Sequence, residues 1–210
     1  MIVDDHAIVR EGLKQIITNT TDLTVAGETD SGIDAIQMHR QRPCDVLLLD
    51  ISMPIKCGLE VLKQFRLEFP QLPVLMLSMH REDMYAFRLL RAGAAGYMSK
   101  LSATADLVSA IRDVAAGRKY ISSALAQELA SHISNGKHQA PHETLSDREF
   151  QTLRMIANGQ TVSEIADRLS LSVKTVSMYR ARLLQKMNLR HNADLMQYAM
   201  RHNLVPEFSV

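Results

Sequence analysis

Five side chains with ligating or reactive groups stand at the ends of short apolar runs that predict β-strands. They are Asp4, Asp5, Asp50, Ser78 and Lys100. In a parallel sheet the carboxyl ends of the strands meet at one edge, so three carboxylates, a hydroxyl and an amine would lie together. Three neighbouring carboxylates repel one another unless a cation lies among them, and hard oxygen ligands suit Mg²⁺. The spacing therefore predicts a magnesium site with an ammonium group beside it.

Asp50 is the predicted nucleophile of this group. A carboxylate held beside a divalent cation, an amine and a hydroxyl can attack a phosphoryl group, because the positive charges neutralise the phosphoryl oxygens. A single Asp after a strand is usually a turn or cap residue, and a single Lys usually faces solvent. The joint placement of these groups on four strand ends favours phosphoryl chemistry.

The order of apolar patterns over the first 117 residues predicts the fold that would position them. Short apolar runs alternate five times with stretches of helical periodicity, which indicates an α/β fold: a doubly wound parallel sheet with helices on both faces. The predicted strands span 2–3, 23–29, 46–50, 73–78 and 96–99, and the predicted helices span 7–18, 32–42, 58–69, 84–92 and 104–116. In the first helix the predicted core residues are Ile8, Leu13, Ile16 and Ile17.

The alternation stops around Gly117. A stretch of helical character, 122–133, precedes a segment without periodicity, 134–143, which predicts a linker. Beyond it every pattern is helical, and "SDRE" and "TVSE" are capping boxes that mark helix starts. Ser172 and Asn192 are predicted N-caps of two further helices. The predicted domains are therefore 1–117, a linker with a helix at 118–143, and an all-α four-helix domain at 144–210.

One predicted helix of the second domain is basic. From Arg168 to Ala193 the chain has six Lys or Arg residues and no acid, although its formal net charge is only +1. This stretch is a candidate surface for an anionic partner. The helix "SVKTVSMYRARLLQKM" follows another helix after the tight turn "SLS", which is the spacing of a helix-turn-helix. Such packing also occurs in proteins that never touch DNA, but the missing acids favour DNA. The predicted core residues of this helix are Val173, Val176, Leu183, Leu184 and Met187.

The blocks "VDDH", "LLLDISMP", "MLSMH" and "AGAAGYMSK" resemble, in the same order, the receiver domain of two-component response regulators. The resemblance covers residues 2 to about 117. It implies a flavodoxin-like five-stranded sheet of order 2-1-3-4-5, with Asp50 as the phosphoacceptor. It also implies Mg²⁺ bound by Asp5, by Asp50 and by the backbone carbonyl of Ser52, with Asp4 completing the acidic pocket.

Three further roles follow from the same resemblance. Ser78 and Lys100 would contact the phosphoryl group. Tyr97, three residues before the Lys, matches the aromatic residue whose rotamer follows phosphorylation in this family.

Residues 145–205 resemble the LuxR-type helix-turn-helix, and a receiver followed by this domain is the architecture of the NarL/FixJ family. The resemblance implies a homodimer on double-stranded promoter DNA, a cognate histidine kinase, and RNA polymerase as a further partner. Short side chains would reach base edges, and longer ones would hold phosphates. The base-edge candidates are Ser177, Met178 and Ala181, and the phosphate candidates are Lys174, Thr175, Tyr179, Arg180, Arg182 and Lys186.

Two other functions compete with this one. Phosphohydrolases of the haloacid dehalogenase type also use a strand-end Asp with Mg²⁺, but they have a second Asp two residues later, where this chain has Ser52. The protein is therefore expected not to be an enzyme beyond its own phosphorylation and slow dephosphorylation. The other alternative is a phosphorylation-independent DNA-binding regulator whose receiver serves only for dimerisation.

The remaining composition indicates the compartment. No apolar run approaches the roughly 20 residues that span a bilayer, so a cytoplasmic protein without membrane insertion is expected. Cys44 and Cys57 flank a predicted strand and are too far apart for a disulfide, so both are expected to be free thiols.

Overall fold

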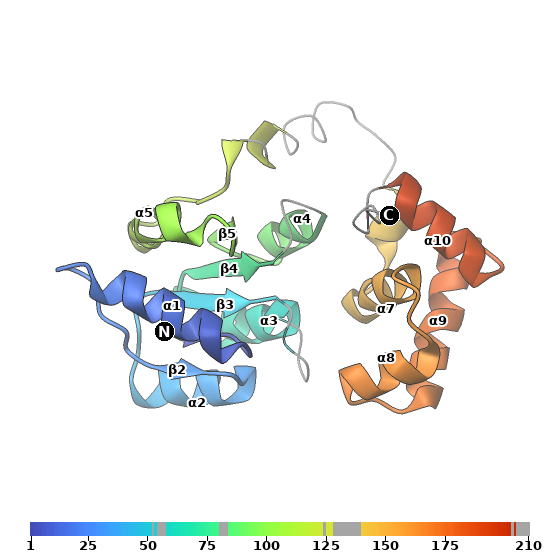
Figure 1. Cartoon of the computed structure of the whole chain (residues 1–210), viewed down its shortest axis with the longest axis horizontal. Coiled ribbons are helices and arrows are strands. Elements are labelled where there is room, and N and C mark those ends of the chain that lie inside the picture. Colours follow the sequence, from blue (N-terminus) through green and yellow to red (C-terminus); the bar gives the residue numbers. More distant parts are fainter. Residues whose placement is uncertain are drawn as a thin grey trace. The chain divides into compact units, whose positions relative to one another are not determined.

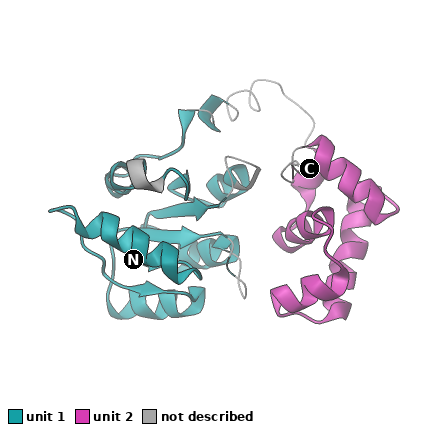
Figure 2. Ribbon diagram, in the orientation of Figure 1, with its two compact units in different colours: residues 1–134 teal, residues 135–210 magenta. Residues whose placement is uncertain are grey.

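The chain folds into two compact units, Met1–Ser134 and Asn135–Val210 (Figure 2). The computed structural model describes residues 1–51, 53, 58–79, 84–123, 125–127, 140–202 and 204. Most of the predicted helix at 122–133 and half of the predicted linker at 118–143 lie outside these residues, as does Cys57. Among the described helices, none combines the length and the apolar character that a membrane crossing requires.

The first unit is a five-stranded parallel sheet of order β2-β1-β3-β4-β5, as predicted (Figure 1). Its strands are β1 (Ile2–Val3), β2 (Glu28–Thr29), β3 (Leu47–Asp50), β4 (Val74–Ser78) and β5 (Gly96–Ser99). Its helices are α1 (Ala7–Thr18), α2 (Gly32–Gln41), α3 (Gly58–Glu68), α4 (Met84–Arg91) and α5 (Ala103–Ala115). The boundaries differ from the predicted ones by one residue or less, except in β2.

The sheet is buried on both faces, which explains why its strands are apolar runs rather than alternating ones. Side chains of β3 point alternately to two cores: Leu47 and Leu49 pack with α2, α3 and α4, and Leu48 packs with α1 and α5. Both cores end where the strands end, so the polar residues that follow collect at one edge.

The predicted strand 23–29 is wrong in length, because only Glu28 and Thr29 pair with a neighbour. The neighbour of β2 is β1, which offers only Ile2 and Val3 for pairing. Residues 22–26 instead line a cavity of about 600 Å³ together with residues 42–46. The ammonium group of Met1 lies beside it and donates to the carbonyl of Val46 at 2.9 Å.

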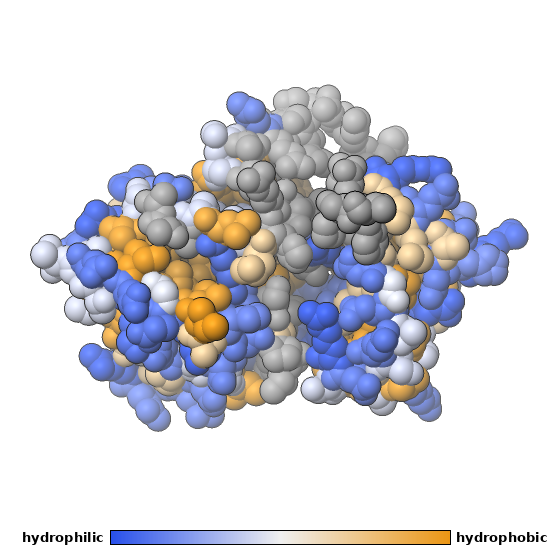
Figure 3. All heavy atoms as spheres, viewed as in Figure 1, coloured by the Kyte–Doolittle hydropathy of each residue, from blue (hydrophilic) through white to orange (hydrophobic). Residues whose placement is uncertain are grey.

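Ile8 is a second correction, since it is 89% exposed and lies in no core. Leu13 and Ile17 are buried as predicted, and Ile16 packs partly against them. Ile8 lies in the first turn of α1. A helical side chain points back toward the N-terminus of its helix, so the side chain of Ile8 points toward the polar edge of the sheet and not toward the core. Apolar atoms are visible among hydrophilic ones on the face that carries α1 (Figure 3).

The chain after α5 returns to the free edge of β5. The amide of Tyr120 donates to Ala95 at 3.1 Å, and the amide of Tyr97 donates to Tyr120 at 2.9 Å. Leu125 is 2% exposed and packs in the same core as Tyr97. The first residues of the predicted linker therefore belong to the first unit.

The second unit is all helical. It contains a short 3₁₀ helix, η1 (Pro141–Thr144), and four α-helices: α7 (Asp147–Ala157), α8 (Val162–Leu169), α9 (Val173–Met187) and α10 (Asn192–Arg201). Both predicted capping boxes are present, at Ser146 with Glu149 and at Thr161 with Glu164. Ser172 caps α9 as predicted, but Asn192 does not cap α10. The carboxylate of Asp194 accepts hydrogen bonds from the backbone amides of Arg190 and His191 at 3.0 and 2.9 Å. This acid therefore supplies the hydrogen bonds of the cap at the start of α10.

Candidate functional site

An acidic pocket lies at the carboxyl edge of the sheet in the first unit. Asp4 follows β1, Asp50 is the last residue of β3, and Ser78 is the last residue of β4. Asp4 and Asp50 are fully buried, and Ser78 is 2% exposed. Burying two carboxylates is costly unless positive charge compensates them.

Lys100 supplies that charge. Its ammonium lies 2.6 Å from Asp4 Oδ2 and 3.0 Å from Asp50 Oδ1, and its side chain is only 4% exposed. These are ion-pair distances, although the angles do not satisfy the geometry of a hydrogen bond. The structure thus brings the predicted amine of strand five onto the acids of strands one and three.

Gly58 holds the backbone around Asp50, and the sequence reasoning missed it. Its amide donates to the carbonyl of Ile51 at 2.9 Å. A Cβ at this position would lie 2.1 Å from the carbonyl oxygen of Asp50, so only glycine allows α3 to begin so close to the acid. A lone glycine eight residues after a strand-end acid was the only signal in the sequence.

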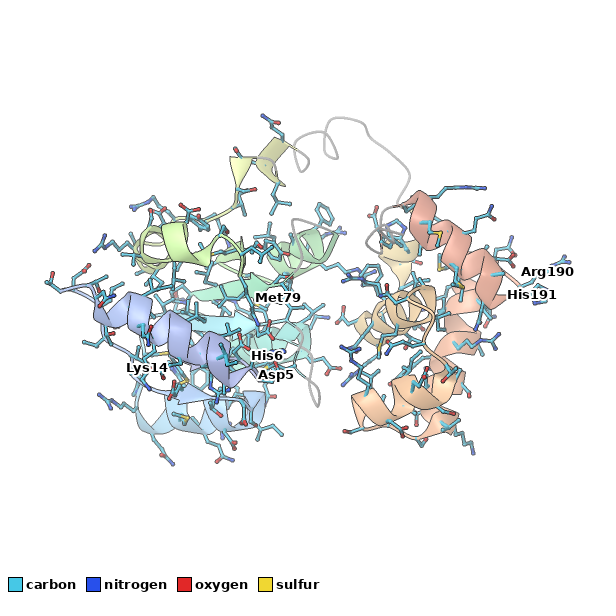
Figure 4. The ribbon with its side chains drawn as sticks, in the orientation of Figure 1. Asp5, His6, Lys14, Met79, Arg190 and His191 are labelled. Carbon is cyan, nitrogen blue, oxygen red and sulfur yellow. The ribbon has the colours of Figure 1, made fainter. Side chains whose placement is uncertain are left out.

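His6 and Arg10 also belong to the pocket and were not predicted. The imidazole Nδ1 of His6 lies 2.9 Å from Asp5 Oδ1 and 3.4 Å from Asp4 Oδ1. The guanidinium of Arg10 donates to the backbone carbonyl of Asp4 at 2.6 Å. His6 precedes α1, directly after the acid pair, and Arg10 lies in its first turn. Figure 4 shows Asp5 and His6 side by side.

The pocket has the composition of a cation site. One potential ligand atom from each of Asp4, Asp5, His6 and Asp50 lies within 4.8 Å of the other three. Asp4 Oδ2 and Asp5 Oδ1 are shielded from solvent and accept no hydrogen bond from the described residues, which leaves them to cationic partners. Ser52, whose carbonyl was a predicted ligand, lies outside the described residues.

Tyr97 lies on β5 with its side chain directed into the core. It is 2% exposed and packs in the cluster that contains Leu89, Ala94 and Leu125. Its position therefore depends on α4, on β5 and on the segment that follows α5.

The second unit contains the predicted helix-turn-helix. The helix α8 ends at Leu169, its C-cap Ser170 adopts a left-handed conformation with φ of 52°, and α9 begins at Val173. The hydroxyl of Ser172 accepts from the amide of Thr175 at 3.0 Å and lies 2.7 Å from the Thr175 hydroxyl. These contacts fix the turn that separates the two helices.

The predicted DNA contacts lie along α9, and most face solvent. Tyr179, Arg180 and Thr175 are half-buried, and Met178 is 41% exposed. The other exposed positions are Lys174, Ser177, Ala181, Arg182 and Lys186. The buried face of the helix consists of Val176, Leu183, Leu184 and Met187, as predicted.

Val173 was predicted to be a core residue and is instead 50% exposed. It is the first residue of α9, so there is no earlier turn of its own helix for the side chain to cover. This places an apolar side chain at the exposed start of the helix, next to Lys174.

Two of the basic side chains have partners within the unit. Arg180 donates to Asn192 Oδ1 of α10 at 2.6 Å, and the Lys186 ammonium lies 2.7 Å from Glu149 Oε2 of α7. Burial opposes the ionisation of Glu149, but Lys186 and the hydrogen bonds from Ser146 outweigh it and lower the pKa of this carboxyl. Arg180 and Lys186 therefore brace α9 against its neighbours, whereas Lys174 and Arg182 extend from it.

Two family models match the chain. Residues 1–112 match the response regulator receiver domain, and residues 143–199 match the bacterial regulatory proteins of the luxR family. Each match lies within one of the two units.

Proteins similar over the whole length include the response regulator UvrY of Escherichia coli (strain K12). It is 40% identical over 205 residues, which cover 97% of this chain and 94% of UvrY. The response regulator GacA of Pseudomonas aeruginosa is 39% identical over 206 residues, which cover 98% of this chain and 96% of GacA.

Solved structures of the response regulator RcsB are also similar. RcsB from Salmonella enterica serovar Typhimurium, bound to promoter rprA in the presence of the phosphomimetic BeF3⁻, has a TM-score of 0.66 and 26% identity, covering 94% of this chain and 95% of that one. A structure of two RcsB dimers bound to two parallel DNAs has a TM-score of 0.59 and 26% identity, covering 95% of this chain and 96% of that one.

Proposed function

The chain belongs to the NarL/FixJ family of two-component response regulators, and from this premise we propose that phosphorylation of Asp50 controls its binding to promoter DNA. The observation that carries the proposal is the ion-pair geometry of Lys100, which bridges Asp4 and Asp50 at 2.6 and 3.0 Å in a buried pocket. A buried amine between two acids would be a poor choice for stability alone. The ammonium group is well placed to pair with the oxygens of a phosphoryl group transferred to Asp50.

The transfer step uses the carboxylate of Asp50 as nucleophile. An Asp50 oxygen attacks the phosphorus of a phosphohistidine on a histidine kinase, the P–N bond breaks, and its electron pair stays on the histidine nitrogen. The product is an acyl phosphate on Asp50. Lys100 exchanges a carboxylate partner for a phosphoryl oxygen, and the Ser78 hydroxyl lies at the end of the adjacent strand to donate to another.

Mg²⁺ is the proposed cation of this pocket. Asp5 and Asp50 would hold it with the carbonyl of Ser52, and Asp4 would complete the acidic surroundings. When bound, the ion supplies positive charge that offsets the negative charge of the phosphoryl oxygens. Slow loss of the phosphoryl group to water would reset the protein, without turnover of an external substrate.

The proposed signal output is a change in DNA binding by α9. Lys174 and Arg182 would contact phosphates, and Ser177, Met178 and Ala181 would lie at base edges. A single small module buries too little surface for strong specific binding, so we propose a homodimer on paired half-sites. Bound to promoter DNA in the cytoplasm, the dimer could also contact RNA polymerase. The proposed order of events is phosphorylation of Asp50, then a change at Tyr97 and β5, then stronger promoter binding.

Intact-mass spectrometry after incubation with acetyl phosphate and Mg²⁺ tests the proposed acceptor. The wild type is expected to gain one acid-labile phosphoryl group, and Asp50→Asn is expected to gain none. Asp45→Asn is the matched control, because Asp45 is an exposed acid at the other end of the same strand region and should label normally. Full labelling of Asp50→Asn would refute the assignment.

A further inference from the structure

The acidic pocket has a nitrogen donor at its opening. His6 is the residue before α1, and its side chain is 58% exposed, so the ring is accessible from solvent. Its backbone amide donates to Asp4 Oδ1 at 2.9 Å, which fixes the residue over the pocket. Its Nδ1 then lies 2.9 Å from Asp5 Oδ1 (Figure 4).

This position is within reach of a cation held by the acids. The four ligand atoms of Asp4, Asp5, His6 and Asp50 are no more than 4.8 Å apart. Donors on opposite sides of one divalent ion are about 4.2 Å apart, because each bond is about 2.1 Å long. The separations of the four ligand atoms therefore exceed those of a single coordination shell by about half an ångström at most, and the side chain of His6 is exposed.

A nitrogen ligand changes which ion the pocket prefers. Mg²⁺ favours carboxylate, carbonyl and water oxygens and gains little from imidazole, whereas Co²⁺ and Zn²⁺ bind imidazole more strongly. We infer that His6 is a direct metal ligand, and that it gives this pocket a selectivity for transition-metal dications that carboxylates alone would not provide. The inference rests on the proposed function, since it concerns the same pocket.

A purely electrostatic role for His6 leads to the opposite expectation. If the imidazole only neutralised the acids, its removal would leave the pocket more negative and would raise its affinity for every dication. If the imidazole is a ligand, its removal lowers the affinity for Co²⁺ by a larger factor than the affinity for Mg²⁺. The ratio of the two affinities separates these roles.

The experiment measures binding of Co²⁺ and of Mg²⁺ to the untagged full-length protein by calorimetry, without any phosphodonor. The variants are His6→Gln, His6→Ala and the control His191→Gln, which removes an exposed imidazole in the second unit (Figure 4). The ratio of Co²⁺ to Mg²⁺ affinity is expected to fall at least about tenfold in both His6 variants, because a coordinating group is lost. His191→Gln should keep the wild-type ratio.

Pulsed electron paramagnetic resonance of one equivalent of Mn²⁺ provides a second readout. The wild type and His191→Gln are expected to show a coupling to nitrogen that is absent from both His6 variants. An unchanged affinity ratio in His6→Gln and His6→Ala, or a wild-type Mn²⁺ signal without nitrogen coupling, would overturn the inference. Neither measurement depends on Asp50 phosphorylation, so failure of the phosphorylation test would be recognised separately.

Discussion

At the scale of single residues, similar side chains have different tasks because their surroundings differ. Lys100 is buried between two carboxylates, Lys186 is paired with Glu149, and Lys174 extends into solvent. Only the first has the compensated, solvent-excluded environment that strengthens electrostatic interactions at a reacting group. The second braces α9 against α7, and the third is available to a phosphate backbone.

The pair formed by Glu149 and Lys186 predicts a pH dependence of stability. The pKa of Glu149 lies below its ordinary value of 4.5 in the folded state, so the folded protein binds this proton more weakly than the unfolded chain. The stability that the ionised Glu149 contributes to the folded protein is present above pH 4.5. It is lost as the pH falls through the lower pKa of the folded state. Glu149→Gln is therefore expected to lower the free energy of unfolding of the second unit at neutral pH. The same variant should lose less stability than the wild type when the pH falls below 4.5.

Urea unfolding of the full-length chain, followed by NMR signals of α7, would measure this difference at neutral and at acidic pH. Asp167→Asn is the matched control, because it neutralises an exposed acid of α8 in the same unit. A steep acid dependence that persists unchanged in Glu149→Gln would show that another carboxyl is responsible.

At the scale of elements, β5 lies between the acidic pocket of the first unit and the segment that follows α5. The amide of Tyr97 on this strand donates to the carbonyl of Tyr120. Lys100 is the residue directly after the strand. A change in the position of Tyr97 would therefore alter its contacts with Tyr120 and Leu125. The contact with Tyr120 requires Gly96, since a Cβ there would lie 2.7 Å from the carbonyl oxygen of Tyr120.

Two glycine-to-alanine substitutions are expected to have opposite effects. Gly96→Ala would push Tyr120 away from β5, and overpacking of this kind typically costs about 1–3 kcal/mol. Gly12→Ala, in α1, would meet no atom within 4 Å and should stabilise the protein by about 0.5–1 kcal/mol. Denaturant unfolding gives both values, and hydrogen exchange at the Tyr97 amide should accelerate only in Gly96→Ala. A slow Tyr97 amide in that variant would contradict the assigned contact.

At the scale of the whole molecule, each unit has its own core and its own site. The acidic pocket lies entirely in Met1–Ser134, and α9 with all its bracing partners lies in Asn135–Val210. Chemistry on Asp50 can therefore influence DNA only through a change in population between states that bind DNA differently. The surface of α9 is built from residues of the second unit alone.

A fragment of residues 140–210 is accordingly expected to bind promoter DNA without phosphorylation. Because Lys174 and Arg182 would contact phosphates, its affinity should fall steeply with salt, and Arg182→Ala should reduce the slope of log affinity against log salt by about one. Fluorescence anisotropy at several salt concentrations measures both. If the fragment binds no DNA while phosphorylated full-length protein does, control by dimerisation through the receiver would be the main mechanism.

The sequence by itself predicted the strands and helices of the sheet domain in their order along the chain, and it predicted that Asp4, Asp50 and Lys100 lie together at the sheet edge. Apolar runs that are buried on both faces have a strong local signature, and capping boxes such as Ser146 with Glu149 mark helix starts within four residues. Strand ends in a parallel sheet necessarily share an edge, so Asp50 and Lys100 could be placed together before any contact was known.

Only the tertiary structure decided what depends on neighbours distant in the sequence. The length of β2 is limited by the two residues of β1 available for pairing, and the exposure of Ile8 and Val173 depends on where each helix begins relative to its core. The approach of Gly58 to the backbone of Asp50 and the position of the His6 side chain beside Asp5 depend on how the loops are placed, which residue types do not encode. Periodicity describes which face of an element is apolar, whereas packing decides how much of that face is covered.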